Sequence, residues 1–231
     1  MLSEKIVVPF IDKTILDISY ARKILNTFNK SLNTEMQPVP IDEIVLDEGL
    51  IIKTANITMD RSIHGMLVCG QTDVDLWDSE NKITYTLFCK EETIFIDESL
   101  LEPALKNRYR FTLAHEYAHW ILHSKIIRKL AKEKKRLPYL TCQERNINME
   151  LIEKVETSCE WQANFLAGAI LMPYLPLKQY CKMNELKNNE DTNYVSEQIR
   201  HLATKYSVSE KAMYVRLRQL NYIDFIEFYE R

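Results

Sequence analysis

The spacing of hydrophobic residues changes near Ser99, and this change limits the folds that the chain can adopt. Before Ser99, four short runs are rich in β-branched and aromatic residues and are separated by polar turn residues, which predicts strands. The runs are residues 50–53, 64–69, 83–88 and 93–97. After Ser99 the spacing is helical. Strands followed by helices predict an α+β domain with a small, mainly antiparallel sheet.

Helices are expected on both sides of these strands. Residues 15–32 have the 3.6-residue period of an amphipathic helix, and a second helix should start near Pro40 and stop at Gly49. Ser99 can cap a short helix that ends near Asn107. The longer helices expected after it are residues 108–125, 148–171, 194–206 and 209–220. The last two are joined at 207–209, the spacing of a helix-turn-helix.

Composition excludes several classes of protein. The 231 residues are 46% hydrophobic and 27% charged, with a net charge of −3, so the overall field does not favour nucleic acid. Five cysteines without a CxxC pair argue against a disulfide framework. The N-terminus lacks the features of a signal peptide, and no window reaches the roughly 20 apolar residues of a membrane span. The sequence therefore predicts a soluble cytoplasmic protein without a membrane partner.

The motif that carries chemistry is His-Glu-Tyr-Ala-His at residues 115–119. On a helix, His115 and His119 project from one face about one turn apart, so both imidazoles can bind a single Zn²⁺. Glu116 lies beside them and can take a proton from the zinc-bound water. The alternative is an ordinary amphipathic helix, but the small residues Ala114 and Ala118 leave room for a metal and a neighbouring helix.

A zinc site of this kind needs a third protein ligand and an open fourth position. Candidates on the later helix are Glu150, Glu153, Glu156, Cys159 and Glu160. Glu160 is favoured because it shares a face with small residues that can pack closely against the first helix. On the same face, Asn164 could hydrogen-bond a ligand histidine.

Residues 108–119, RYRFTLAHEYAH, and 160–173, EWQANFLAGAILMP, resemble the motifs of the ImmA/IrrE-type metallopeptidases. On this resemblance His115, His119 and Glu160 match the zinc ligands, Glu116 matches the catalytic base, and Asn164 falls on the Asn of the Ala-Asn pair. The resemblance implies a zincin-like metallopeptidase domain over residues 1–185, with active-site helices and one Zn²⁺ per chain. It also implies a short helix-turn-helix-like extension over residues 190–231, packed on that domain.

Two positions depart from the family pattern. Ala118 stands where glycine is common, and Ala169 stands where glutamate is common. Neither position is a presumed ligand, so the departures leave the expected metal site intact.

Other candidate residues have weaker support. His123 lies eight residues after His115 and about 80° round the helix, so it is expected to line the cleft, to bond a zinc ligand, or to be structural. The group that stabilises the oxyanion stays open among Tyr139, His201 and Tyr206.

Two functions from different classes follow. The first is a zinc endopeptidase. The resemblance to the ImmA/IrrE-type family implies that its substrate is a protein, a helix-turn-helix transcriptional repressor. We expect the enzyme to recognise this repressor through the helical tail and the basic run at 125–136. The second is a DNA-binding regulator with a vestigial or structural metal site, which would bind phosphates through Arg216 and Arg218. The residues near the start of the last helix are poorly suited to reading bases, so nucleic acid is the less favoured partner.

Overall fold

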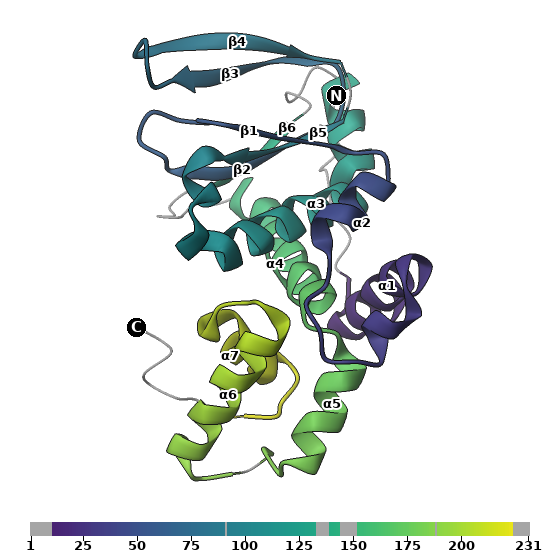
Figure 1. Ribbon diagram of the computed structural model, residues 1–231. Coiled ribbons are helices and arrows are strands. Elements are labelled where there is room, and N and C mark those ends of the chain that lie inside the picture. The colour runs from purple at the N-terminus through teal and green to yellow at the C-terminus, as the bar shows by residue number, and fades with distance from the viewer. Residues whose placement is uncertain (1–10, 91, 133–138, 144–151, 188, 224–231) are drawn as a thin grey trace. The chain divides into compact units, whose positions relative to one another are not determined.

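The computed structural model describes residues 11–90, 92–132, 139–143, 152–187 and 189–223, and it is a mixed α+β protein (Figure 1). Two compact units form, Ile41–Phe165 and a helical unit made of Lys13–Pro40 with the residues from Leu166 onward. Among the described helices, none combines the length and apolar character needed to cross a bilayer. The division into residues 1–185 and 190–231 stays a prediction.

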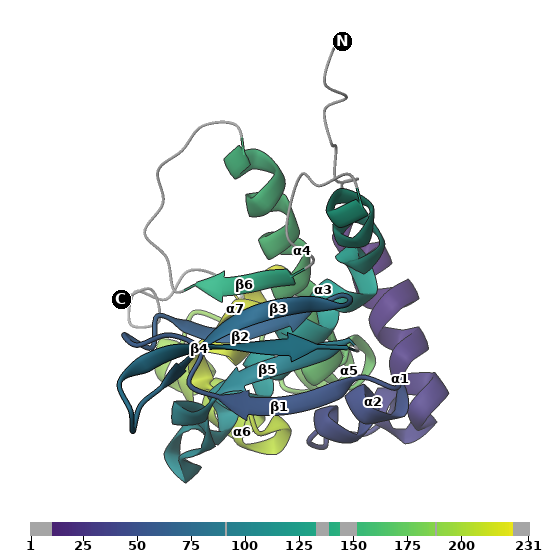
Figure 2. The same cartoon turned by 90° about the horizontal axis from the view of Figure 1, so that it is seen from above.

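The first unit contains a four-stranded sheet in the order β1-β5-β2-β6. Its strands are β1 (Ile51–Ala55), β2 (Ile63–Val68), β5 (Thr93–Asp97) and β6 (Tyr139–Gln143). β2 runs antiparallel to both of its neighbours, β5 and β6, whereas β1 and β5 are parallel. Figure 2 shows the four strands side by side.

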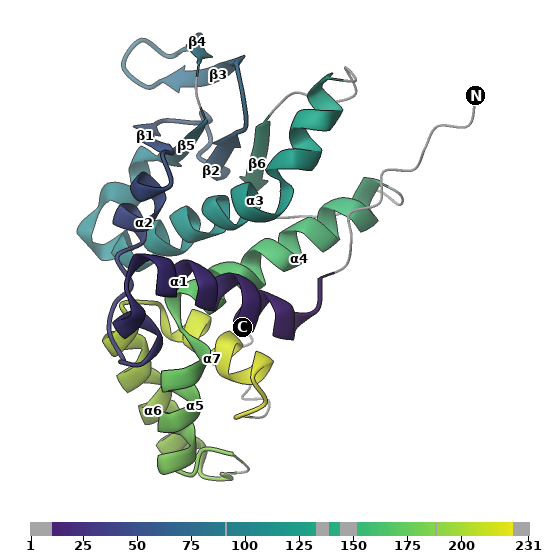
Figure 3. The same ribbon diagram turned by 90° about the vertical axis from the view of Figure 1, so that its right-hand side faces the viewer.

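A separate hairpin of β3 (Thr72–Asp78) and β4 (Ile83–Cys89) covers one face of this sheet (Figure 3). The hairpin buries Val74, Leu76 and Cys89 against Met66 and Phe95 of the sheet. The alternation of Asp73, Val74, Asp75 and Leu76 explains this placement, because successive strand residues point to opposite faces. A polar turn at 78–81 joins the two strands, and Asp78 accepts hydrogen bonds from the backbone of Glu80 and Asn81.

The long helix α3 (Lys106–Lys132) packs against β2 and β5 on the other face of the sheet. Short helix α2 (Ile41–Asp47) packs against α3, and the Tyr109 hydroxyl donates a hydrogen bond of 2.7 Å to Asp42. The sheet thus lies between the hairpin and α3. This arrangement makes α3 a buried helix, with Leu113, Ala114, Tyr117 and Ala118 fully enclosed.

The helical unit begins with a π-helical segment (Ile15–Ala21) that continues into α1 (Arg22–Phe28) and a 3₁₀ turn (Lys30–Asn33). Its other helices are the end of α4 (Ile152–Leu171), α5 (Tyr174–Met183), α6 (Thr192–Tyr206) and α7 (Glu210–Gln219). Asp191 and Ser209 cap α6 and α7 with side-chain hydrogen bonds to backbone N–H groups. α6 and α7 confirm the two helices expected at the end of the chain.

A buried ion pair joins the two ends of the helical unit. Arg216 of α7 is 1% exposed and binds both carboxylate oxygens of Asp17 through its two terminal nitrogens. Its Nε donates to the carbonyl of Met172 at 3.1 Å. Arg216 is therefore committed to the interior and is not available to a DNA phosphate, contrary to the DNA-binding hypothesis. Arg218 is exposed and lies 5.8 Å from the ring centroid of Tyr214.

Several elements differ from the expectations. β3, β6 and α5 were not expected, because β3 alternates apolar residues with aspartates and α5 contains Pro176 in its first turn, where proline is tolerated. Asp97, not Ser99, caps the helical turn after β5, since its carboxylate accepts from the Ser99 N–H at 3.0 Å. α3 continues seven residues past Lys125 and takes in the start of the basic run; residues 133–136 of that run lie outside the described residues.

Candidate metal centre

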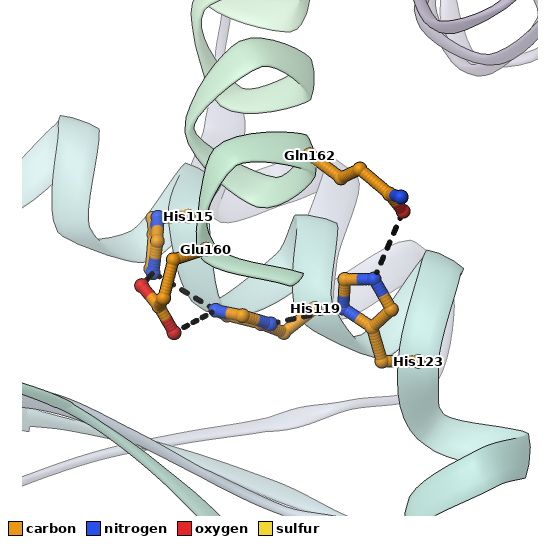
Figure 4. A network of polar contacts seen from close by, with 5 residues as sticks. All are labelled: His115, His119, His123, Glu160 and Gln162. Carbon is orange, nitrogen blue, oxygen red and sulfur yellow. Dashed lines mark hydrogen bonds and ion pairs between the residues drawn. The ribbon is translucent and has the colours of Figure 1, made fainter. Parts of the chain in front are cut away.

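α3 holds the two histidines of the motif in the position that their spacing predicts. Both rings are buried, and the Nε2 atoms of His115 and His119 lie 3.0 Å apart. One helical turn separates the two residues, so the rings converge on a single point beside the helix. The ring planes are nearly perpendicular, at 82°. Two nitrogen donors therefore face the same small volume (Figure 4).

Glu160 of α4 completes the group. Its two carboxylate oxygens lie 3.2 Å from His115 Nε2 and 3.1 Å from His119 Nε2. The donor atoms of His115, His119 and Glu160 all lie within 4.8 Å of one another. Glu160 is 23% exposed, so one side of the group is open to solvent. Of the candidates from the sequence, Glu160 is the residue that the structure brings to the histidines.

The electrostatics of the group keep its donors available to a cation. Burial lowers the pKa of His119 to about 4, with a further lowering by His115, so the ring is neutral at pH 7. Burial alone would raise the pKa of Glu160, but hydrogen bonds with His115 and His119 hold it below its ordinary value. A carboxylate at Glu160 and a neutral imidazole at His119 are the protonation states that a metal requires of these two ligands.

The donor set fits zinc. Catalytic zinc sites use three protein ligands, among them the combination of two histidines and a glutamate, and keep a fourth position open. A tetrahedral ion with bonds of about 2.0–2.1 Å has its donors roughly 3.3 Å apart. The distances between the three donors, 3.0–3.2 Å, are close to that value.

Glu116 lies against the sheet beside the metal group. Its side chain is fully buried, and neither carboxylate oxygen has a hydrogen-bond partner among the described residues. Burial raises the pKa of Glu116 to about 8, partly offset by the nearby His115. A buried carboxyl group without a partner is costly in a folded protein, so its position points to a role with a ligand or water.

The close approach of Glu116 to β2 depends on Gly65. A Cβ atom at position 65 would lie 2.5 Å from Glu116 Oε1 and 2.8 Å from the Thr112 methyl group. These distances are shorter than any ordinary contact, so the strand admits only glycine there unless Glu116 moves. Nothing in the sequence reasoning identified Gly65, because the contact joins a strand and a helix that are 51 residues apart in the sequence.

His123 belongs to the same buried group, on the outer side of His119. Its Nδ1 lies 3.0 Å from His119 Nδ1, and its Nε2 lies 3.2 Å from the amide oxygen of Gln162 (Figure 4). Asn164, which the sequence suggested for a contact of this type, is exposed on α4, and Gln162 is the buried amide. The sequence reasoning missed Gln162, although it lies only two residues after Glu160.

The remaining candidates are distributed over both units. Tyr139 lies in β6 opposite Val68, but its side chain lies outside the described residues, as do those of Glu150, Glu153 and Glu156. His201 is exposed on α6, in the helical unit, with its ring stacked on Tyr180 at 5.7 Å. Tyr206 is buried in the same unit. The oxyanion-stabilising residue therefore stays unassigned.

Comparison with known proteins identifies a family and distantly similar solved structures. The IrrE N-terminal-like domain, Peptidase_M78, matches residues 72–218, which include both histidines, Glu116 and Glu160. No similar curated protein was found. A Mycobacterium tuberculosis transcriptional regulator is similar in structure, with 14% sequence identity and a TM-score of 0.46 over 88% of this chain. This chain covers 46% of that regulator's length.

Proposed function

Because the chain belongs to the IrrE N-terminal-like family, Peptidase_M78, and is a metallopeptidase of the HExxH type, we propose that it uses zinc to make a site-specific cut in a helix-turn-helix transcriptional repressor. The observation that carries the proposal is the convergence of His115, His119 and Glu160 beside a buried Glu116. Three ligands and a neighbouring base are what zinc-dependent peptide hydrolysis requires. The zincin-like fold that the resemblance implies belongs to the same proposal.

In this proposal His115, His119 and Glu160 hold the zinc. When bound, zinc supplies Lewis-acid chemistry, since it polarises a carbonyl oxygen and lowers the pKa of water. In its ionised form, which the positive charge of a bound zinc would favour, Glu116 takes the proton of the attacking water and delivers it to the leaving amine nitrogen. The sheet supports this role, because Gly65 lets Glu116 lie beside β2 without a hydrogen bond that would compete for the proton.

The proposed substrate follows from the family resemblance and from the need for selectivity. Proteins of the family that this chain resembles cleave helix-turn-helix repressors and so derepress genes. An unselective protease would damage the cell that contains it, so narrow specificity is expected. Recognition would use the helical tail and the basic run that begins at the end of α3, in addition to the metal site.

Co-expression with a helix-turn-helix repressor, chosen from any that is encoded next to this protein, tests the proposal. We expect one cut in the repressor with the native protein and none with Glu116→Gln, which keeps the shape of the side chain but removes the base. Glu102→Gln, an exposed glutamate on the same unit, serves as the matched control and should cut normally. An intact repressor together with efficient, unselective degradation of casein would overturn the proposed substrate.

A further inference from the structure

We propose that β4 is an interface at which two copies of this chain pair antiparallel, forming one intermolecular sheet with the strand order β3-β4-β4-β3. The proposal is independent of the metal site, because the hairpin and α3 lie on opposite faces of the four-stranded sheet. Three features of β4 support it: a free backbone edge, exposed apolar side chains, and a sequence that fits a second β4.

The hairpin leaves the outer edge of β4 without a backbone partner. A two-stranded sheet pairs each strand on one side only, so every second residue of β4 points its N–H and C=O away from β3. The outer side of β3 is bonded, since the Trp77 N–H donates to the Asn56 carbonyl at 2.9 Å. No described residue outside the hairpin makes a backbone hydrogen bond to β4. Figures 1 and 3 show β4 on the far side of β3 from the four-stranded sheet.

The sequence of β4 lacks the features that protect an exposed edge. Native edge strands usually carry charged residues, a proline or a bulge. The edge strand β1 has the exposed Lys53, and β3 has Asp73, Asp75 and Asp78. In contrast β4, ITYTLFC, contains no charge and no proline, and its pairing with β3 is continuous from Ile83 onward. An unprotected edge of this length favours pairing with another strand.

Several apolar side chains of β4 are exposed to solvent. Cys89 and Leu87 pack into the core, and Ile83 and Tyr85 follow on the same face at the strand period. At the turn end of the hairpin, however, Ile83 is 54% exposed and Tyr85 is 40% exposed. Phe88, on the opposite face, is 52% exposed. A second strand along this edge would bury part of the apolar surface, and such burial stabilises an assembly.

The side chains of β4 are complementary to those of a second β4. With a two-fold axis at Tyr85, antiparallel pairing places Ile83 opposite Leu87 of the second copy. The same register places Thr84 opposite Thr86 of the second copy. Apolar pairs and threonine pairs directly opposite each other stabilise antiparallel strands. Because β4 has no charged residue, the pairing brings no like charges together within the strand.

Charges beyond the ends of β4 also match in this register. The exposed Lys90 follows β4 at one end, and the turn at the other end has a net negative charge from Asp78, Glu80 and Lys82. Position 90 of each copy then faces position 80 of the other, so two opposite-charge pairs form. The paired sheet ends at a β3 strand on both sides, where the aspartates oppose a further strand. The assembly therefore closes as a two-fold dimer and does not grow into a fibre.

Sedimentation equilibrium of the whole protein tests the dimer. One strand per copy is a small interface, so we expect a dissociation constant of about 1–100 µM. Thr84→Lys/Thr86→Lys places like charges opposite each other and should weaken association at least about tenfold. The matched control is Thr54→Lys, which adds a charge to the exposed edge strand β1 and should associate like the native protein.

Two outcomes of this measurement would overturn the proposal. One is a native protein that is still monomeric at about 1 mM, well above the expected dissociation constant. The other is a folded Thr84→Lys/Thr86→Lys protein that associates as strongly as the native protein.

A mixing experiment separates loss of pairing from loss of folding. Thr84→Glu/Thr86→Glu should also fail to self-associate, whereas a mixture of the Lys and Glu double variants should form a heterodimer at least as tight as the native dimer. Heterodimer formation requires that both variants are folded, and circular dichroism with thermal melting checks each one alone. Two folded variants that do not associate with each other would contradict the proposed register.

Cross-linking tests the two-fold axis in a protein that keeps both threonines, and it decides if a double variant does not fold. In a Cys142→Ser/Cys159→Ser protein, Tyr85→Cys places two thiols directly opposite each other, with Cβ atoms about 4.5–5.5 Å apart. A short bifunctional thiol reagent should then give a covalent dimer, whereas Thr54→Cys should stay monomeric. A dimer in solution that Tyr85→Cys does not cross-link would overturn the proposal.

The outcome for the dimer is distinguishable from the outcome for the proposed function. Association, mixing and cross-linking involve neither zinc nor a peptide substrate. A repressor that is never cut would refute the proposed substrate and leave the β4 interface unaffected.

Discussion

Two buried polar groups, one in each compact unit, differ in how their charges are satisfied. In the helical unit, Arg216 meets Asp17 and the Met172 carbonyl, so the cation has both an opposite charge and hydrogen bonds. In the first unit, three donors converge on one point and the adjacent Glu116 has no described partner. The first arrangement satisfies its own charges, as a structural ion pair must, whereas the second presents donors and a carboxyl group that a metal ion and a water molecule would satisfy. Burial of polar groups alone therefore does not identify a functional site.

The largest expected effect comes from removing a donor of the metal group. Purified native protein should carry about one zinc per chain. In Glu160→Ala, His115→Ala and His119→Ala the loss of affinity should exceed the 10–100-fold typical of a lost outer partner. Metal analysis after dialysis measures it. Glu116→Gln should keep its zinc, so equal loss in this variant would remove the distinction between ligand and base.

Breaking the Arg216–Asp17 ion pair should lower the stability of the protein and leave the chemistry of the metal site unchanged. Arg216→Met leaves Asp17 as a buried charge without its partner, and we expect a loss of about 3–5 kcal/mol in the free energy of unfolding. Urea denaturation measures it. Arg218→Met is the matched control, since Arg218 is exposed, and should change stability by less than about 0.5 kcal/mol. Equal effects of the two substitutions would contradict a structural role for the Arg216–Asp17 pair.

Gly65→Ala tests whether the position of Glu116 matters separately from metal binding. The added methyl group must displace Glu116, and a shift of about 1 Å in a catalytic group can reduce the rate about 10²-fold. Zinc affinity should change little, because the atoms nearest to the added methyl group belong to Glu116 and Thr112 and not to a donor of the metal group. Cleavage rate and zinc affinity are measured on the same preparation. Gly70→Ala, whose added Cβ meets no atom within 4 Å, is the control and should cleave normally.

The smallest expected effect is the reactivity of the cysteine thiols buried in the two units. Burial raises the pKa of Cys69 in the first unit and of Cys181 in the helical unit to about 12. At pH 8 the fraction of thiolate at each is about 10⁻⁴, so neither should react with a thiol reagent in the folded protein. Labelling of a Cys142→Ser protein followed by mass spectrometry measures this. The partly exposed Cys159 should react first, and rapid labelling of Cys181 alone would show that the helical unit opens more readily.

Parts of the fold were predictable where the signal is local. Helical spacing predicted α6, α7 and the core of α3, and the β-branched runs predicted β1, β2, β4 and β5. Gly49 ends the turn after α2 with a φ of +82°, a conformation in which glycine is favoured. β3 was missed because its aspartates reduce its average hydrophobicity, although the alternation of Asp73 to Leu76 carries the strand period.

In the metal site, too, features that depend on local sequence were predictable, and contacts between distant elements were not. The i, i+4 spacing of His115 and His119 places their rings together on any helix, so the sequence by itself determined this half of the metal group, the adjacent base Glu116 and the family. Only the tertiary structure decided that Glu160 reaches both rings, that Gln162 and not Asn164 is the buried amide, and that Arg216 is bonded to Asp17, 199 residues away. Helical periodicity fixes the directions of side chains within one element, but contacts between elements depend on how their faces pack, and a single sequence does not specify that packing locally.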